Sequence, residues 1–118
     1  MFNKVFLIGH LASDPEVRAS PSGTYVTRVR IATNTYAGKA EDGTAREHTE
    51  FHSLVLFGKP AETAGTLLHK GQLLFVEGEL RTSSWEDPAS AQKKYRTDVV
   101  VDKFKLLGPK QQPQQAAA

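Results

Sequence analysis

Two histidines of this 118-residue chain have spacing that could suit a metal site. His48 and His52 lie four positions apart around an acidic residue. A zinc-binding His-Glu-x-x-His helix has its glutamate directly after the first histidine, but here Thr49 takes that position. His52 also falls in a segment with strand character, where four residues span roughly 13 Å, too far for both rings to reach one ion. Because the chain also lacks cysteine, we expect no metal site.

Catalytic and nucleotide-binding motifs are incomplete. The Gly58-Lys59 pair resembles the end of a phosphate-binding loop, but Pro60 replaces the required serine or threonine and Ser53 replaces the first glycine. The sequence contains no Gly-x-Ser-x-Gly nucleophile motif. We therefore expect a protein that is not an enzyme and that carries no cofactor.

Aromatic residues interleaved with cations indicate binding instead. The candidates are the aromatic residues Tyr36, Phe51, Phe57 and Trp85 and the cations Arg28, Arg30, Lys59 and Arg81. The even spacing of Phe51 and Phe57 places both on one face of a strand, and Trp85 lies in a polar loop. Bases stack on such rings while cations follow the phosphates, which is typical of binding to single-stranded nucleic acid. The alternative for the two phenylalanines is the hydrophobic core, where phenylalanine is usually found.

Five short segments of strand character must position these residues: 5–8, 25–31, 51–57, 73–80 and 95–107. Gly78 inside the fourth segment predicts a bulge. One helix is expected from Pro60 to about Lys70, because proline suits a first helical turn and Gly71 follows as a stop. The polar connections 36–48 and 83–94 are expected to be long hairpin loops. This order predicts an all-β fold with one short helix, a five-stranded OB-fold barrel with long hairpin loops, a fold that commonly binds oligonucleotides or oligosaccharides.

Composition fits one domain, which we place at residues 1–108, followed by a disordered tail rich in Gln, Pro and Ala at 109–118. The chain has 15 Lys and Arg against 13 Asp and Glu, a net charge of +2 that permits a nucleic-acid partner without requiring one. No apolar run approaches the roughly 18 residues of a membrane span, and the first residues do not resemble a signal peptide. We expect a cytoplasmic protein without a membrane partner.

Short motifs along nearly the whole chain resemble bacterial single-stranded DNA-binding proteins. The matching motifs are Asn3-Lys4-Val5, Leu7-Ile8-Gly9, Asp14-Pro15-Glu16-Val17-Arg18, Pro21-Ser22-Gly23, Ala32-Thr33-Asn34, Thr49-Glu50-Phe51-His52, Val55-Leu56-Phe57-Gly58-Lys59, Lys70-Gly71, Val76-Glu77-Gly78, Leu80-Arg81-Thr82 and Trp85. The combination is far more specific than any one of them.

This resemblance implies an OB-fold homotetramer that wraps single-stranded DNA with little sequence preference during replication, recombination and repair. The family's base-stacking aromatic residues fall on Phe51, Phe57 and Trp85, and its basic contacts fall on Lys59, Lys70 and Arg81. A further stacking tryptophan of the family falls on Ala37 here, and the neighbouring Tyr36 is the candidate substitute. The resemblance also implies that His52 lies at a subunit contact.

The chain departs from the family pattern in two places. Two basic positions between Arg81 and Trp85 are Ser83 and Ser84 here, so we expect this segment to hold phosphate less strongly. The family usually ends in an acidic tail that recruits replication and repair enzymes, whereas this chain ends Gln115-Ala116-Ala117-Ala118. We therefore do not expect those enzymes as partners of this chain, and a truncated tail and a short paralogue both fit.

Two other functions stay open from the sequence. One is a primosomal-type OB-fold nucleic-acid-binding protein, which is usually dimeric. The other is an oligosaccharide-binding OB subunit, although such subunits are typically secreted and disulfide-bonded, and this chain has no cysteine.

Overall fold

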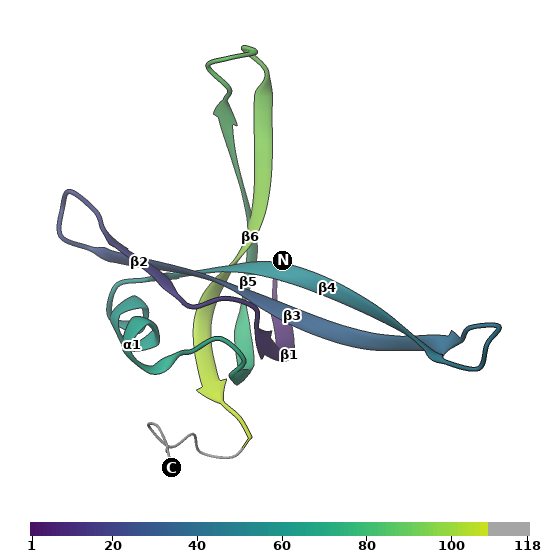
Figure 1. Ribbon diagram of the computed structural model, residues 1–118. Helices are drawn as coiled ribbons and strands as arrows, with labels where there is room; N and C mark the ends of the chain where they lie inside the picture. The colour runs from purple at the N-terminus through teal and green to yellow at the C-terminus, as the bar shows by residue number, and fades with distance from the viewer. Residues whose placement is uncertain (109–118) are drawn as a thin grey trace.

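The computed structural model describes residues 1–108 (Figure 1). Its elements are β1 (Val5–Leu11), β2 (Glu16–Ala19), β3 (Tyr25–Lys39), β4 (Ala45–Phe57), α1 (Lys59–Leu67), β5 (Leu73–Glu86) and β6 (Lys93–Leu106). Five strands are hydrogen-bonded in the order β1-β5-β6-β4-β3, and β3 pairs back to β1, so they close into a ring. The prediction of an all-β fold with one short helix and five barrel strands is confirmed. The predicted tail, 109–118, lies outside the described residues.

Alternation along the strands separates an inner face from an outer face. Leu54 and Leu56 of β4 point into the ring and are buried, together with Ile31 of β3 and Val99 of β6. Phe51 and Phe57 have the opposite parity and stay 51% and 46% exposed, so the alternative that these phenylalanines belong to the core is wrong. This alternation is what a half-buried strand requires.

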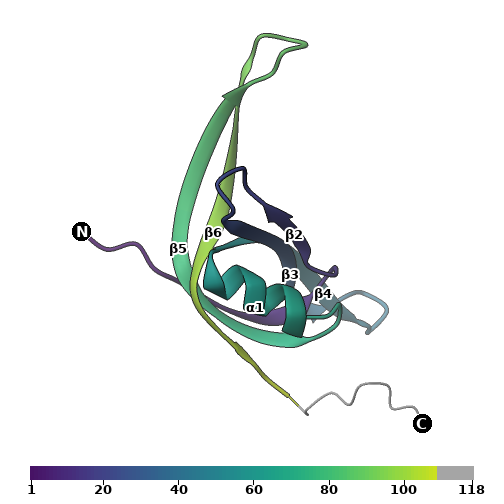
Figure 2. The ribbon, with the colours of Figure 1, turned by 90° about the vertical axis from the view of Figure 1, so that its left-hand side faces the viewer.

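One helix is present, as predicted, but it spans Lys59–Leu67 and not 60–70. Ala61 and Ala64 are fully buried and pack it against the end of the ring, beside β2 and β3 (Figure 2). The chain leaves helical geometry at Leu68 because the segment that follows is held elsewhere. The Lys70 N–H donates to Asp14 Oδ1 at 2.9 Å, and the Gly71 N–H donates to a β1 carbonyl at 2.8 Å. Within residues 1–108, no helix has the length and apolar character to cross a membrane.

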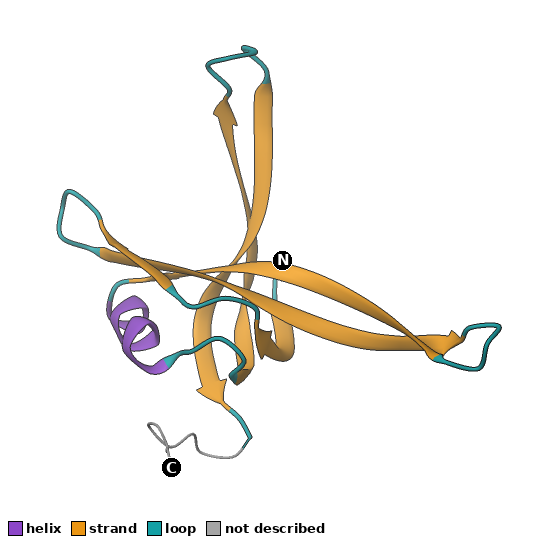
Figure 3. Cartoon of the chain, viewed as in Figure 1, coloured by secondary structure: helices purple, strands orange, loops and turns teal. Residues whose placement is uncertain are grey.

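Two strand pairs continue far beyond the ring (Figure 3). The β3–β4 pairing reaches Lys39 opposite Ala45, and the β5–β6 pairing reaches Glu86 opposite Lys93. The loops are therefore shorter than the expected 36–48 and 83–94, because strands cover residues 36–39 and 45–48 of the first segment and residues 83–86 and 93–94 of the second. Antiparallel pairing satisfies the backbone of these polar segments, so they extend as two-stranded ribbons that need no apolar face. We call the parts of these two pairs that lie beyond the β4–β6 pairing the β3–β4 ribbon (residues 30–39 and 45–53) and the β5–β6 ribbon (residues 81–86 and 93–98).

Glycines allow close backbone approach at two points of the ring. The β5–β6 register shifts between Glu77 and Gly78, which confirms the predicted bulge. A Cβ atom at Gly78 would collide with the Val100 carbonyl, and one at Gly9 would collide with the Ala32 carbonyl where β1 meets β3. Both approaches shape the barrel and help it to close.

Candidate nucleic-acid interface

The outer face of β3 and β4 carries the two phenylalanines and two arginines. Opposed residues of an antiparallel pair have side chains on the same side of the sheet. Arg28 lies opposite Val55 and Arg30 opposite Ser53, so both arginines share the face of Phe51 and Phe57. The guanidinium carbon of Arg30 lies 4.8 Å from the centroid of the Phe51 ring. This distance is within the range of a cation–π contact.

Tyr36 extends the same face outward along the β3–β4 ribbon. It lies opposite Glu47, which is four positions before Phe51 in β4 and therefore has its side chain on the same face. Tyr36 therefore lies on the same face as Phe51. At about 3.3 Å per residue, it is roughly 13 Å farther along β3 than Ala32, the residue opposite Phe51. Its ring is largely exposed. The structure brings Tyr36 into line with Phe51, which the sequence alone did not establish.

The β5–β6 ribbon carries Trp85. The expectation of a loop tryptophan is wrong: Trp85 lies in β5 opposite Lys94, and its side chain is 47% exposed. Ser83 lies opposite Arg96 and Arg81 opposite Asp98, so these side chains share the face of Trp85. Arg81 Nη2 donates to Glu79 Oε2 at 3.4 Å, and both side chains are exposed.

The two predicted lysines lie apart from these strand faces. Lys59 is the first residue of α1, directly after the end of β4, and it lines a shallow groove along that helix. Lys70 lies in the connection between α1 and β5, where its backbone is tied to Asp14. Lys59 is therefore close to Phe57 in the chain, whereas the structure does not place Lys70 on the face that carries the aromatic rings.

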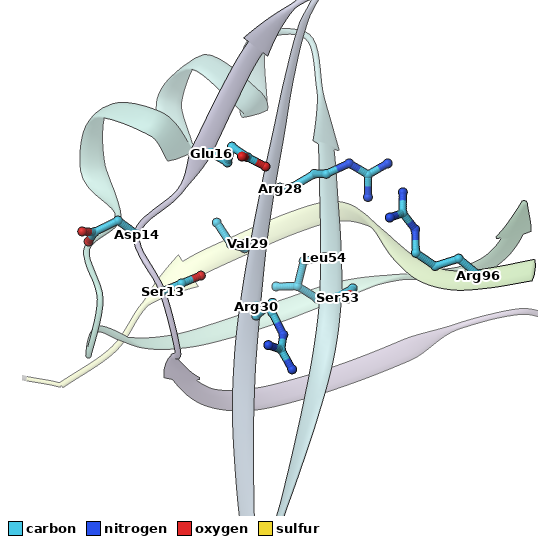
Figure 4. Close-up of a pocket in the computed structure, with 9 residues that line it drawn as sticks. All are labelled: Ser13, Asp14, Glu16, Arg28, Val29, Arg30, Ser53, Leu54 and Arg96. Atoms are coloured by element: carbon cyan, nitrogen blue, oxygen red, sulfur yellow. The ribbon is translucent and has the colours of Figure 1, made fainter. Parts of the chain in front are cut away.

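Sequence reasoning did not single out Arg96 and Asp98, which lie where the two ribbons separate. β4 and β6 pair at only two positions, Leu54 with Val99 and Val55 with Val100. Just beyond, Asp98 Oδ2 lies 3.6 Å from Arg28 Nη1 and 3.4 Å from Arg96 Nε. A cavity of about 390 Å³ opens beside this cluster (Figure 4). Only the long-range register of β6 reveals the cluster, and no local motif signals it.

A second group of exposed apolar residues lies on the outer face of β1 and β5. Phe6 and Ile8 are more than half exposed, and the Phe6 ring stacks on Phe75 with 6.4 Å between centroids. Beside them Lys4 Nζ lies 2.9 Å from Glu77 Oε2. This hydrogen bond lowers the pKa of Glu77 and raises the pKa of Lys4 from their ordinary values.

His52, the predicted subunit contact, lies on the inner parity of β4 at the end of the ring. It is half-buried, and its Nε2 lies 3.0 Å from Thr33 Oγ1. The imidazole therefore has a hydrogen-bond partner within its own chain, as a histidine beside apolar neighbours requires. His48, on the same face farther out, lies 2.8 Å from Glu50 and is exposed.

A closed ring of five strands with a helix between the third and fourth ring strands defines an OB fold; here the ring strands are β1, β3, β4, β5 and β6, and α1 lies between β4 and β5. In that fold the second and third strands, here β3 and β4, and the connection between the fourth and fifth commonly contact oligomeric ligands. The model of the single-strand binding protein family matches residues 2–107, and the chain belongs to this family.

Similar solved structures agree with this assignment. The wild-type single-stranded DNA-binding protein of Thermus aquaticus is 36% identical with a TM-score of 0.74, over 91% of this chain and 50% of that one. A deletion mutant of the same protein has a TM-score of 0.75 at the same identity, over 91% and 51%. This chain thus spans about half the length of the Thermus aquaticus protein. The Plasmodium falciparum protein in a complex with single-stranded DNA shares the fold, with a TM-score of 0.80 at 23% identity over 92% of this chain and 97% of that one.

Proposed function

We propose that this protein binds single-stranded DNA with little sequence preference and protects it during replication, recombination and repair. The observation that carries the proposal is the Arg30 guanidinium over the half-exposed Phe51 ring, on the face that also bears Phe57. A ring stacks on any base, and a neighbouring cation neutralises the adjoining phosphate. Family membership over residues 2–107 supports the same function.

Both ribbons contribute to the proposed interface. The residues that stack on bases are Phe51, Phe57, Trp85 and Tyr36, and the cations that contact phosphates are Arg28, Arg30, Lys59, Lys70 and Arg81. The β3–β4 ribbon presents Phe51 and Tyr36 along one line, and the β5–β6 ribbon presents Trp85. Of the nine residues, Lys70 has the weakest geometric support, because it lies off the strand faces.

Fluorescence of the single tryptophan tests this function directly. Trp85 should be quenched when poly(dT) is added, because stacking on a base changes the surroundings of the indole. Binding should weaken with salt at a log–log slope of about −0.7 for each phosphate neutralised. Duplex DNA of equal length is the control for simple charge attraction, and an oligosaccharide is the control for the sugar-binding alternative. Affinity that is independent of salt, or equal for duplex DNA, would contradict the proposal.

We also propose that the protein assembles as a homotetramer. Phe6, Ile8 and Phe75 form an apolar outer surface on β1 and β5, and exposed apolar patches of this kind mark protein–protein contacts. His52 is the second proposed contact. A charged or bulky replacement of His52 should weaken assembly before it weakens the fold. Sedimentation velocity at micromolar concentration should give a tetramer; a dimer would favour the primosomal-type alternative, and a monomer would refute the assembly.

The proposed role is binding without catalysis. Stacking and phosphate contacts break no covalent bond, and they require no cofactor. Binding to exposed DNA strands places the protein at the nucleoid in the cytoplasm, and this location is part of the proposal. Incubation with single-stranded DNA should leave the strand length unchanged on a denaturing gel.

A further inference from the structure

The strongest feature that the proposed interface does not yet use is the cluster between the two ribbons, where Arg28 meets Arg96 and Asp98. Arg28 of β3 and Arg96 of β6 point toward one another at the cavity beside the ribbon junction (Figure 4). Both approach the same atom, Asp98 Oδ2, at 3.6 and 3.4 Å. These separations exceed the 2.7–2.9 Å or so of a charge-assisted hydrogen bond. Two positive charges therefore share one negative charge that holds neither of them tightly.

Hydrogen-bonding capacity in this cluster is left unused. Asp98 is only 7% exposed, and its Oδ1 atom has no hydrogen-bond partner among the described residues. Each guanidinium has five donor N–H groups, yet within residues 1–108 neither Arg28 nor Arg96 donates a side-chain hydrogen bond to the protein. A second anion can therefore enter between the guanidinium groups without breaking a good hydrogen bond.

We propose that Arg28 and Arg96 form a seat for one phosphodiester group of the bound strand, and that Asp98 is the resident counter-ion that this phosphate displaces. The proposal rests on single-stranded DNA binding as the function and adds Arg96 and Asp98 to its machinery. Guanidinium groups suit this role because their planar donors match phosphate oxygens in pairs.

The position of the seat fits a strand that crosses from one ribbon to the other. Arg30, stacked on Phe51, lines the same cavity from the β3–β4 ribbon. Arg96 lies two residues from Lys94, which is opposite Trp85 on the β5–β6 ribbon. A phosphate between Arg28 and Arg96 would therefore lie on the path of a strand that passes from the β3–β4 ribbon to the β5–β6 ribbon.

Acidic residues limit where an anion can lie in the cavity. Asp14 and Glu16 line it from the segment before and at the start of β2, whereas the two guanidinium groups lie on the β6 side (Figure 4). Repulsion from these carboxylates directs a phosphate toward the arginine side. Asp98 is the acidic residue that lies between the arginines themselves.

Salt dependence of DNA binding tests the seat. The variant Arg96→Gln should make the log–log slope for a short dT oligonucleotide shallower by about 0.7 per subunit, the value of one lost phosphate contact. Arg96→Lys keeps the charge and should keep the slope. Lys105→Gln is the matched control, because it removes one exposed cation from β6, away from both ribbons; since Lys105 lies opposite Phe75, sedimentation checks that this variant assembles like wild type. Thermal melting checks that each variant is folded.

The variant Asp98→Asn tests the counter-ion. Without the competing carboxylate, affinity at low salt should rise by about two- to fivefold, the range of a partly exposed ion pair. Its melting temperature without DNA should fall, because two guanidinium groups then face each other without an anion. Weaker DNA binding by a folded Asp98→Asn protein would overturn the counter-ion role.

The outcomes separate this inference from the function on which it depends. If wild-type protein shows no quenching of Trp85 by dT, the proposed function itself fails. If wild-type protein binds and the slope of Arg96→Gln equals that of Lys105→Gln, the function stands and the seat is wrong. If Arg96→Gln is shallower and Lys105→Gln is not, the seat is supported whatever the stability of Asp98→Asn.

Discussion

Two outer faces of the same barrel expose aromatic rings in different surroundings. On β3 and β4, Phe51 has the Arg30 guanidinium over its ring. On β1 and β5, Phe6 stacks on Phe75, and the nearby Lys4 is paired with Glu77 and Asp102. We call them the cationic face and the apolar face. Each leaves a phenylalanine about half exposed or more, so exposure alone does not distinguish them.

The difference lies in what the neighbouring charges are free to do. Lys4 on the apolar face already has two carboxylates within 4 Å, so a phosphate gains little there. Arg30 on the cationic face contacts a ring, and Arg28 shares the Asp98 carboxylate with Arg96. An exposed ring beside a lysine that is already paired with carboxylates favours contact with another protein. An exposed ring beside cations without tight ion pairs favours contact with a nucleic acid.

The largest expected effect comes from placing a charge on the apolar face. Phe6→Asp puts a carboxylate beside Phe75 and should break the proposed tetramer, with a loss above about 2 kcal/mol of association free energy, the range of an interface hot spot. Sedimentation velocity should show smaller species at micromolar concentration. Because the cationic face is unchanged, each dissociated subunit should still bind dT, and its Trp85 fluorescence should still be quenched. A Phe6→Asp tetramer would remove the distinction between the two faces.

Next in size are truncations of two proposed stacking residues, Phe57 on the cationic face and Trp85 on the β5–β6 ribbon. Phe57→Ala and Trp85→Ala should each weaken DNA binding by about 1–3 kcal/mol, the value of one stacked base. Neither side chain fills the core, so the free energy of unfolding should change far less than the roughly 2–5 kcal/mol expected for Leu54→Ala in the core. Because Trp85→Ala removes the fluorophore, a labelled dT oligonucleotide reports its binding. Normal binding with a large fall in melting temperature would make Trp85 structural.

Tyr36→Ala extends this comparison along the β3–β4 ribbon. Tyr36 shares the face of Phe51, and if it replaces the missing loop tryptophan its truncation should also cost about 1–3 kcal/mol of binding free energy. Titration with dT oligonucleotides of increasing length measures it, because the outermost ring should matter most for longer strands. No change at any length would leave Phe51 and Phe57 as the stacking residues of β4, with none in β3.

Much of this architecture could be predicted from local pattern. Even spacing placed Phe51 and Phe57 on one face, the glycine inside the fourth segment marked the bulge at Gly78, and Pro60 marked the start of the helix. Each of these signals is local, since alternation and turn chemistry act over a few residues.

The rest depends on pairing between distant segments. Strand β2 has no alternation, because all four of its residues are exposed, and it exists through backbone pairing with β3. The outer parts of both ribbons are polar, so their composition indicated loops. Ser83 stands where the family pattern has a basic residue, so the sequence suggested that a positive charge is missing there. Arg96 lies opposite Ser83 in the β5–β6 pairing and supplies a positive charge at that position. No local rule gives that register.

The smallest expected effect concerns the ion pair of the apolar face. The hydrogen bond from Lys4 lowers the pKa of Glu77 below its ordinary value of 4.5. A carboxyl with a lowered pKa stabilises the fold above its unfolded pKa, and that contribution disappears as pH falls through the lower folded value. Lys4, with a raised pKa, loses its contribution only as pH rises above 10.5. Glu77→Gln should therefore melt slightly below wild type at pH 7, and the gap should close below about pH 4.5.

A matched variant at a second ion pair of β5 completes this test. Glu79→Gln removes the partner of Arg81, whose contact of 3.4 Å is longer than the 2.9 Å between Lys4 and Glu77. Its melting curve should follow wild type across the same pH range, while its affinity for dT should rise slightly because Arg81 is released. If Glu77→Gln instead raised DNA affinity and Glu79→Gln did not, Lys4 would be the cation available to phosphate. The division between the two faces would then be drawn in the wrong place.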